Sequence, residues 1–89
     1  MNFIHASEYL DEGDVVIVTS SHQCNVCVMD DSNFANYRSG RRFTYYGGHF
    51  THFPVRIPVP SSGHWNVTLD LGGGSANIRY NIQYLKRAA

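Results

Sequence analysis

The last third of the chain alternates between apolar and polar residues, and this period of two constrains the fold more than any other feature. The alternation runs from His64 to Leu71, stops at Gly72-Gly73-Gly74-Ser75, and resumes up to Tyr84. Successive side chains of a β-strand point to opposite faces, so each run buries one face. The apolar positions are Trp65, Val67, Leu69 and Leu71 before the break and Ala76, Ile78, Tyr80, Ile82 and Tyr84 after it. A glycine-rich break between two such runs predicts a β-hairpin with one buried face.

The run from Phe53 to Pro60 also alternates, but its polar side contains Pro54, Pro58 and Pro60. Because proline has no N–H for a strand ladder, this run predicts a strand at the edge of a sheet. A polyproline-type ligand for a partner domain is the alternative. The apolar side favours the strand, since it carries Phe53, Val55, Ile57 and Val59.

Three further strands and one helix complete the expected elements. Phe3–Leu10 is expected to be the opening strand, and the apolar-rich runs Val15–Val18 and Asn25–Met29 predict strands buried on both faces. A short helix is expected over Asn33–Gly40, because Asp30-Asp31-Ser32 can cap its start and the glycine can end it. The sequence therefore predicts a single domain over residues 1–89. Its class is all-β and mostly antiparallel, a small sandwich or partly open barrel of six or seven short strands with one short helix.

The charge balance restricts the partners of the chain. Seven basic and seven acidic side chains give a formal net charge of zero, whereas nucleic-acid binding normally needs a positive excess, so no general nucleic-acid binding is expected. The sequence contains no signal-peptide pattern and no apolar run of about 20 residues, so we expect a cytoplasmic protein that does not enter a membrane. Charged residues make up only 16%, which would fit a face covered in a homo-oligomer.

Cys24 and Cys27 form a CxxC pair, and His49 and His52 form an HxxH pair. On a strand, residues three apart point to opposite faces, so neither pair is expected to hold one metal ion. A structural zinc site also needs four ligands in tetrahedral reach. Although His5, His22 and His64 lie elsewhere in the chain, we expect no metal site and two buried, free cysteines that act as small apolar residues.

No pattern in the chain predicts catalysis. The sequence contains no nucleophile elbow, no GxGxxG and no P-loop. The glycines at 72–74 would resemble a phosphate loop only before a helix, and a strand is expected there. The carboxylates cluster at expected turns and at the helix cap. We therefore expect no catalytic residue and no cofactor.

Residues 37–53 combine aromatic, basic and glycine residues in a loop-rich stretch. Aromatic faces beside guanidinium donors suit a flat ligand such as a base, a nucleotide or a sugar. The candidate ligand-binding residues are Arg41, Arg42, Tyr45, Tyr46, His49 and His52. The alternative is that the arginines are solvated and the tyrosines cover the edge of the core. We favour this alternative, because exposed aromatic residues are only weak indicators of a binding site.

Several short motifs are spread over nearly the whole sequence. They are Met1-Asn2-Phe3-Ile4-His5-Ala6, Leu10-x-x-Gly13-Asp14, Cys24-Asn25-Val26, Met29-Asp30-Asp31-x-Asn33-Phe34 with Tyr37, Tyr46-Gly47-Gly48, Phe53-Pro54, Pro58-Val59-Pro60, and Gly63-x-Trp65-Asn66-Val67 with Asp70-Leu71-Gly72-Gly73. Through these motifs the chain resembles a family of small bacterial proteins known as domain of unknown function 1883. The resemblance implies a compact, largely β domain, which in some relatives accompanies a TIR domain. It implies no catalytic residue.

These observations favour a non-enzymatic ligand-binding or interaction module whose partner is a small ligand or a protein. One alternative is a small metal-dependent hydrolase that uses His49, His52 and a cysteine. Another is the structural subunit of a homo-oligomer, in which a covered face explains the scarcity of charges.

Overall fold

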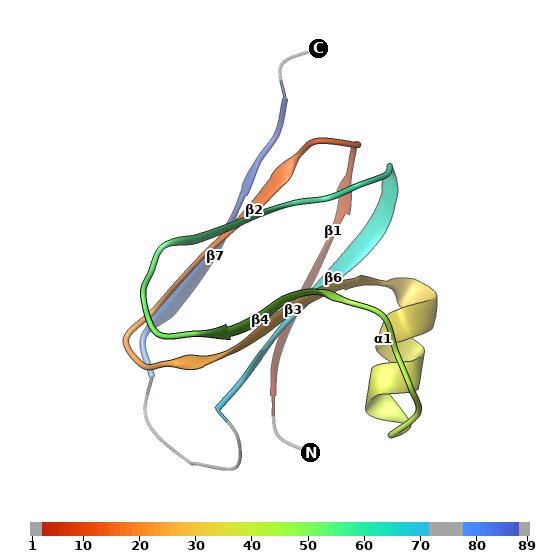
Figure 1. Ribbon diagram of the computed structural model, residues 1–89. Helices are drawn as coiled ribbons and strands as arrows, with labels where there is room; N and C mark the ends of the chain where they lie inside the picture. Colours follow the sequence, from red (N-terminus) through yellow and green to blue (C-terminus); the bar gives the residue numbers. More distant parts are fainter. Residues whose placement is uncertain (1–2, 72–77, 88–89) are drawn as a thin grey trace.

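The chain folds into two packed antiparallel sheets and one short helix (Figure 1). The computed structural model describes residues 3–71 and 78–87. In these residues the elements are β1 (Ile4–Leu10), β2 (Val15–Ser20), β3 (Cys24–Asp30), α1 (Asp31–Arg38), β4 (Tyr46–Phe50), β5 (Val55–Pro58), β6 (Gly63–Asp70) and β7 (Tyr80–Leu85). One sheet has the strand order β1-β6-β3-β4 and the other β5-β2-β7. This arrangement confirms the mostly antiparallel, sandwich-like class that the sequence predicts.

The main core lies between the inner faces of the two sheets. It consists of Leu10, Val16, Val18, Cys24, Val26, Val28, Val55, Ile57, Val59, Trp65, Val67 and Leu69. The inward residues of β5 and β6 are the apolar positions that the alternating runs predict. β5 lies at the edge of its sheet, with Arg56 and Pro58 exposed. The prediction of a proline-protected edge strand is therefore confirmed.

The predicted C-terminal hairpin is wrong. β6 pairs with β1 and β3, whereas β7 pairs with β2 in the other sheet. Alternation identifies the face that a strand buries but not its neighbour, and both sheets bury a face in the same core. A connection between sheets therefore gives the same pattern as a hairpin. The glycine-rich break itself lies outside the described residues. In β7, Ile82 and Tyr84 pack against the core as expected, but Tyr80 is half exposed.

The two strands that were expected to be buried on both faces differ. In β3 the prediction is confirmed, because Cys27 and Met29 on the outer face are buried as well as Val26 on the inner face. In β2 the prediction is wrong for the outer face: Val15 and Ile17 are only half-buried. Within the described residues, no helix covers that side of the three-stranded sheet (Figure 1).

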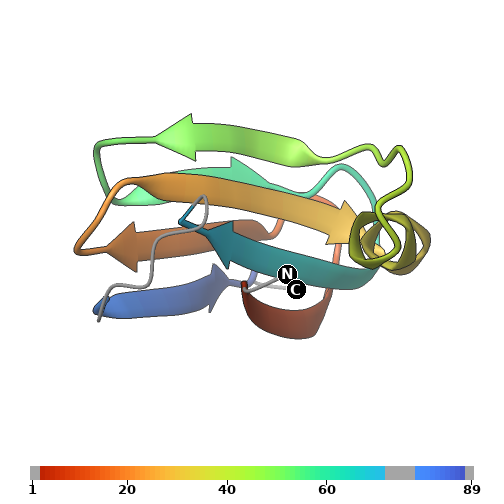
Figure 2. The same ribbon diagram turned by 90° about the horizontal axis from the view of Figure 1, so that it is seen from below.

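Helix α1 begins at Asp31, directly after β3, and lies at the end of the four-stranded sheet, where Figure 2 shows it almost end-on. The Asp30 Oδ1 atom accepts a hydrogen bond from the Asn33 N–H at 2.9 Å, the geometry of an N-cap. The helix ends two residues before Gly40, whose φ of +74° suits glycine. The predicted helix is thus confirmed, with its start two residues earlier.

Helix α1 closes a second, smaller apolar cluster on the outer face of the four-stranded sheet. We call this the outer cluster; its members are Cys27, Met29, Tyr37, Phe3, Phe34 and Phe43. Within the described residues, no helix has the length and hydropathy needed to cross a membrane.

Candidate functional site

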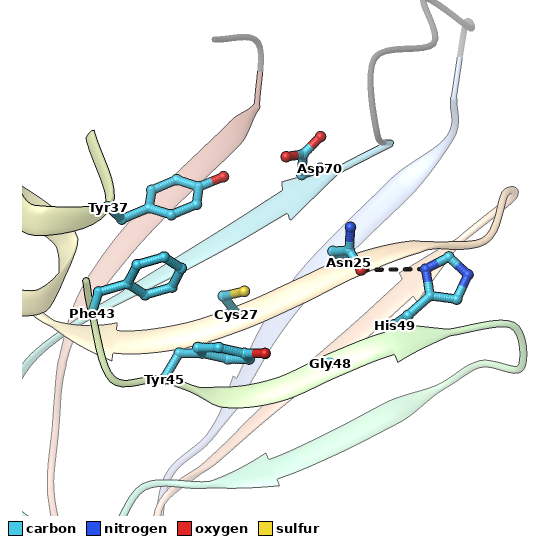
Figure 3. A pocket seen from close by; sticks show the side chains of 8 residues that line it. All are labelled: Asn25, Cys27, Tyr37, Phe43, Tyr45, Gly48, His49 and Asp70. Carbon is cyan, nitrogen blue, oxygen red and sulfur yellow. Dashed lines mark hydrogen bonds between the residues drawn. The ribbon is translucent and has the colours of Figure 1, made fainter. Parts of the chain in front are cut away.

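A pocket of about 450 Å³ lies on the outer face of the four-stranded sheet, beside the outer cluster (Figure 3). Its lining residues are Asn25, Cys27, Tyr37, Phe43, Tyr45, Gly48, His49 and Asp70. This volume falls within the range of about 300–1,000 Å³ that is typical of small-molecule sites. The pocket is therefore large enough for a ligand of one or two rings.

One side of the pocket is an aromatic wall, made by Tyr37 from α1 and by Phe43 and Tyr45 from the segment that leads into β4 (Figure 3). The ring centroids of Tyr37 and Phe43 are 5.0 Å apart at an interplanar angle of 79°. Those of Phe43 and Tyr45 are 5.3 Å apart at 38°. Phe3 supports Tyr37 from behind, edge to face at 5.1 Å. Contacts of this kind stabilise aromatic pairs beyond simple burial, so the wall is preorganised.

The other side of the pocket is a row of polar residues across three neighbouring strands. Asn25 on β3 lies opposite Asp70 on β6 and opposite His49 on β4. Neighbouring strands lie about 4.8 Å apart, so the three side chains share the outer face as direct neighbours. The His49 Nδ1 and Asn25 Oδ1 atoms are 3.3 Å apart, within hydrogen-bonding distance (Figure 3). The pocket therefore has an aromatic end and a polar end.

The next row toward the helix contains Thr68, Cys27 and Gly47, of which Cys27 lines the floor of the pocket. Gly47 has a φ of +131°, and a Cβ at this position would collide with the carbonyl oxygen of Val26. Only glycine fits this backbone. That Cβ would point into the sheet, toward Val26 and Ile57, and not into the pocket, which Gly48 lines instead on β4.

The floor of the pocket disfavours negative charge. Burial raises the pKa of the Cys27 thiol, and the nearby Asp70 carboxylate raises it further. Burial, followed by the charge of Asp70, likewise raises the pKa of the Tyr37 phenol. The Thr68 hydroxyl offsets both shifts in part, although neither Thr68 Oγ1 nor Tyr37 Oη makes a well-formed hydrogen bond within the described residues. Both groups are therefore neutral at neutral pH, and Cys27 is a poor nucleophile.

The structure brings two of the six candidate binding residues into this pocket, Tyr45 and His49. Tyr46 points to the other face of β4, where its ring lies 6.2 Å from that of Trp65. Arg41 and Arg42 are exposed in the segment after α1 and do not line the pocket. His52 is exposed in the turn after β4, next to Thr51.

Sequence reasoning missed the polar and floor residues of the pocket, namely Asn25, Cys27, Gly48 and Asp70. Asn25 is a polar residue within the apolar-rich strand β3, and this was the available signal, whereas Asp70 is one of several polar residues that alternate along β6. Their meeting depends on β6 pairing with β3, which the predicted hairpin did not include.

The two cysteines lie on opposite faces of β3, as the strand geometry predicts. Cys24 belongs to the main core and Cys27 to the outer cluster, and both are buried and free. Within residues 3–71 and 78–87, no group of three or more His, Cys, Asp or Glu side chains could hold a metal ion.

A second polar network attaches the start of α1 to the sheet. Asn66, which is 2% exposed, donates from Nδ2 to Asp31 Oδ1 at 2.8 Å and to the Met29 carbonyl at 3.4 Å. Its Oδ1 atom lies 2.9 Å from His5 Nε2, which must therefore carry the proton. His64 Nδ1 lies 3.0 Å from the same Asp31 oxygen. These hydrogen bonds hold the helix against the sheet and so keep Tyr37 at the pocket.

Fold and site together define a small antiparallel β-sandwich with a ligand-sized pocket on the helix-covered face of one sheet. The family comparison makes the identification specific. The chain matches the family described as a domain of unknown function, DUF1883, over residues 1–88, and it belongs to that family. The resemblance seen in the sequence is thus confirmed. No curated protein and no solved structure matches the chain.

Proposed function

We propose that the protein is a non-enzymatic binding module that holds a small, flat ligand in the pocket on the four-stranded sheet. The observation that carries the proposal is the division of this pocket into a preorganised aromatic wall and a facing row of polar side chains. A concave apolar site with a few convergent polar groups is the usual form of a small-molecule site. The wall provides contact area and the polar row provides orientation.

Two features of the lining support binding rather than catalysis. A nucleophile needs a lowered pKa or an adjacent base, whereas burial raises the pKa of the Cys27 thiol. The imidazole of His49 lies within hydrogen-bonding distance of the amide of Asn25, a group that neither accepts nor releases a proton in acid–base catalysis. The location that we propose for this module is the bacterial cytoplasm, where buried thiols such as those of Cys24 and Cys27 stay reduced.

The adjacent tyrosines Tyr45 and Tyr46 provide a matched pair of variants for testing this function. They are 43% and 44% exposed, but only Tyr45 lines the pocket. A thermal-shift screen of flat metabolites, nucleobases and sugars should give ligands that stabilise the wild type and Tyr46→Ala but not Tyr45→Ala. The Tyr45→Ala substitution removes the contact between the ligand and one ring, so the affinity of the ligand should fall roughly tenfold. Hits that bind both variants equally would contradict the proposed site.

Two direct measurements separate the alternatives. Metal analysis of the purified protein tests the metal-dependent hydrolase, which requires close to one equivalent of zinc, iron or copper. Solution mass tests the homo-oligomeric subunit, for which the half-exposed apolar side chains on the outer face of β2 are the supporting observation. A metal-free monomer would leave the binding module as the remaining function of the three.

A further inference from the structure

The electrostatic character of the pocket limits the class of ligand it can hold. Asp70 is the carboxylate among the described residues of the lining, and none of these residues is a lysine or arginine. The arginines at 41 and 42, which the sequence predicts as ligand donors, lie outside it. An anion bound here would face a carboxylate in a partly dehydrated site, where repulsion is stronger than in water. A phosphate or carboxylate ligand is therefore disfavoured.

The negative charge of Asp70 acts on neighbouring ionisable groups, including those that line the pocket. Burial is the main reason that the pKa values of Cys24, Cys27 and Tyr37 are raised, and Asp70 raises each of them further. Cys27 on β3 and Tyr37 on α1 line the pocket together with Asp70, whereas Cys24 lies on the inner face of β3. A field that opposes the formation of anions at Cys27 and Tyr37 also favours a cation in the pocket that they line.

The aromatic wall favours the same sign of charge. The faces of tyrosine and phenylalanine rings attract cations that lie within about 6 Å of the ring centroid. Tyr45 is 43% exposed and tilted against Phe43, so part of its ring is available to a ligand. A carboxylate has two acceptor oxygens with about four lone-pair sites, so Asp70 can bind a ligand in addition to its present interactions.

From these features we propose that the ligand is a planar organic cation, whose flat face lies on the Phe43–Tyr45 wall and whose amidinium or guanidinium group binds Asp70. Such a group presents two parallel N–H donors that match the two oxygens of a carboxylate. The Asn25 side chain, next to Asp70 in the polar row, supplies a further amide for a ligand N–H or carbonyl. This inference rests on the proposed function and adds the sign of the charge and the shape of the ligand.

Three probes with the same ring test the inference, namely benzamidinium, neutral benzamide and anionic benzoate. We expect benzamidinium to bind, with chemical-shift changes at Tyr45, Cys27 and Asp70 in NMR titrations. Its affinity should exceed that of benzamide roughly fivefold, as expected for one partly solvated ion pair, and benzoate should not bind. Tetramethylammonium, a compact cation, should bind more weakly than benzamidinium because it cannot pair with both carboxylate oxygens.

Asp70→Asn removes the charge with little change in shape and should abolish the preference for benzamidinium over benzamide. Glu12→Gln is the control, because it removes an exposed carboxylate in the β1–β2 turn, away from the pocket. If Asp70→Asn failed to fold, Tyr45→Ala would replace it, with an expected loss of benzamidinium binding that Tyr46→Ala does not share.

The outcomes separate this inference from the proposed function. Binding of benzamide or benzoate as tightly as benzamidinium, with dependence on Tyr45, would overturn the cation and leave the binding module intact. Absence of benzamidinium binding at 10 mM probe, a concentration suited to fragment-sized ligands, would overturn the cation, while the Tyr45 and Tyr46 screen would decide the module independently. A preference for tetramethylammonium would contradict the planar shape.

Discussion

The outer faces of the two sheets differ although their inner faces share one core. On the four-stranded sheet, α1 and the outer cluster cover Cys27 and Met29 completely or nearly so. On the three-stranded sheet, Val15 and Ile17 occupy the corresponding outward positions of a central strand and stay half-buried. Both strands are rich in apolar residues. Burial of a strand's outer face therefore depends on whether another element packs against it, and the sequence of the strand alone does not determine this.

The covered face is also the face that carries the polar groups and the pocket. Helix α1 and the aromatic residues lie at one end of this face, and the row of Asp70, Asn25 and His49 lies beyond them (Figure 3). The pocket lies at this boundary, where the apolar cover ends and polar side chains begin. A hollow of similar volume, about 440 Å³, lies on the three-stranded sheet, but its described lining is Ile17, Ile82, Gln83, Tyr84 and Leu85, without a charged group. Incomplete coverage of the four-stranded sheet thus produces a concave site that combines an aromatic wall with a carboxylate.

Truncation of one outward-facing residue on each sheet should give the largest difference in the free energy of unfolding between the two sheets. Met29→Ala removes a side chain that is 0% exposed and should lower the free energy of unfolding by about 3 kcal/mol. Ile17→Ala removes a half-buried side chain from the uncovered face and should cost only about 1 kcal/mol. Urea denaturation of both variants measures the difference. Equal losses would show that both faces are covered in solution.

The polar network under α1 provides the next largest effect. Asn66→Ala removes the hydrogen bonds to Asp31, Met29 and His5, and should lower the free energy of unfolding by about 2 kcal/mol. Asn81→Ala, an exposed asparagine on the three-stranded sheet, is the control and should change it by less than about 0.5 kcal/mol. A loss in Asn66→Ala no larger than in the control would mean that the network does not hold the helix.

Removal of the Tyr37 hydroxyl should have a smaller effect of the opposite sign. Tyr37 Oη is buried without a hydrogen-bonding partner in the described residues, so the folded state carries the desolvation cost of a hydroxyl. Tyr37→Phe keeps the ring contacts and should raise the free energy of unfolding by up to about 1 kcal/mol. Thermal unfolding measures this directly. Destabilisation by more than 1 kcal/mol would reveal a partner for the hydroxyl.

The smallest expected effect is a pH dependence that belongs to the covered face. Hydrogen bonding with His64, followed by that with Asn66, lowers the pKa of Asp31 below its ordinary value of 3.8. A carboxylate whose pKa is lowered on folding stabilises the protein above pH 3.8, and this stabilisation is lost as the pH falls through the lowered value. Asp31→Asn should therefore lose less stability than the wild type between neutral pH and acid. Identical pH profiles, with Glu12→Gln as control, would contradict the assignment.

The sequence predicts the elements of this fold better than their arrangement. Period-two patterns correctly identify the inward faces of β5 and β6, and Asp30 and Gly40 mark the limits of α1 within two residues. The pairing of β6 with β1 and β3 was missed because local patterns contain no information on partners far along the chain.

The site was predictable only in part, for the same reason. Tyr45 and His49 were found because they lie in one conspicuous aromatic segment. Asp70 and Asn25 are distant from each other along the chain and become neighbours only through strand pairing. The arginines at 41 and 42 were chosen because they lie beside aromatic residues in the sequence, but the backbone after α1 carries them away from the pocket.

The junction between β3 and α1 has a mechanical consequence. Asp30 is both the last residue of the strand and the N-cap of the helix, so no loop separates the two. A molecule seated between Cys27 on β3 and Tyr37 on α1 contacts both of these directly joined elements. Because Asp30 belongs to both elements, a molecule that tilts α1 must also displace the end of β3, an inner strand of the four-stranded sheet.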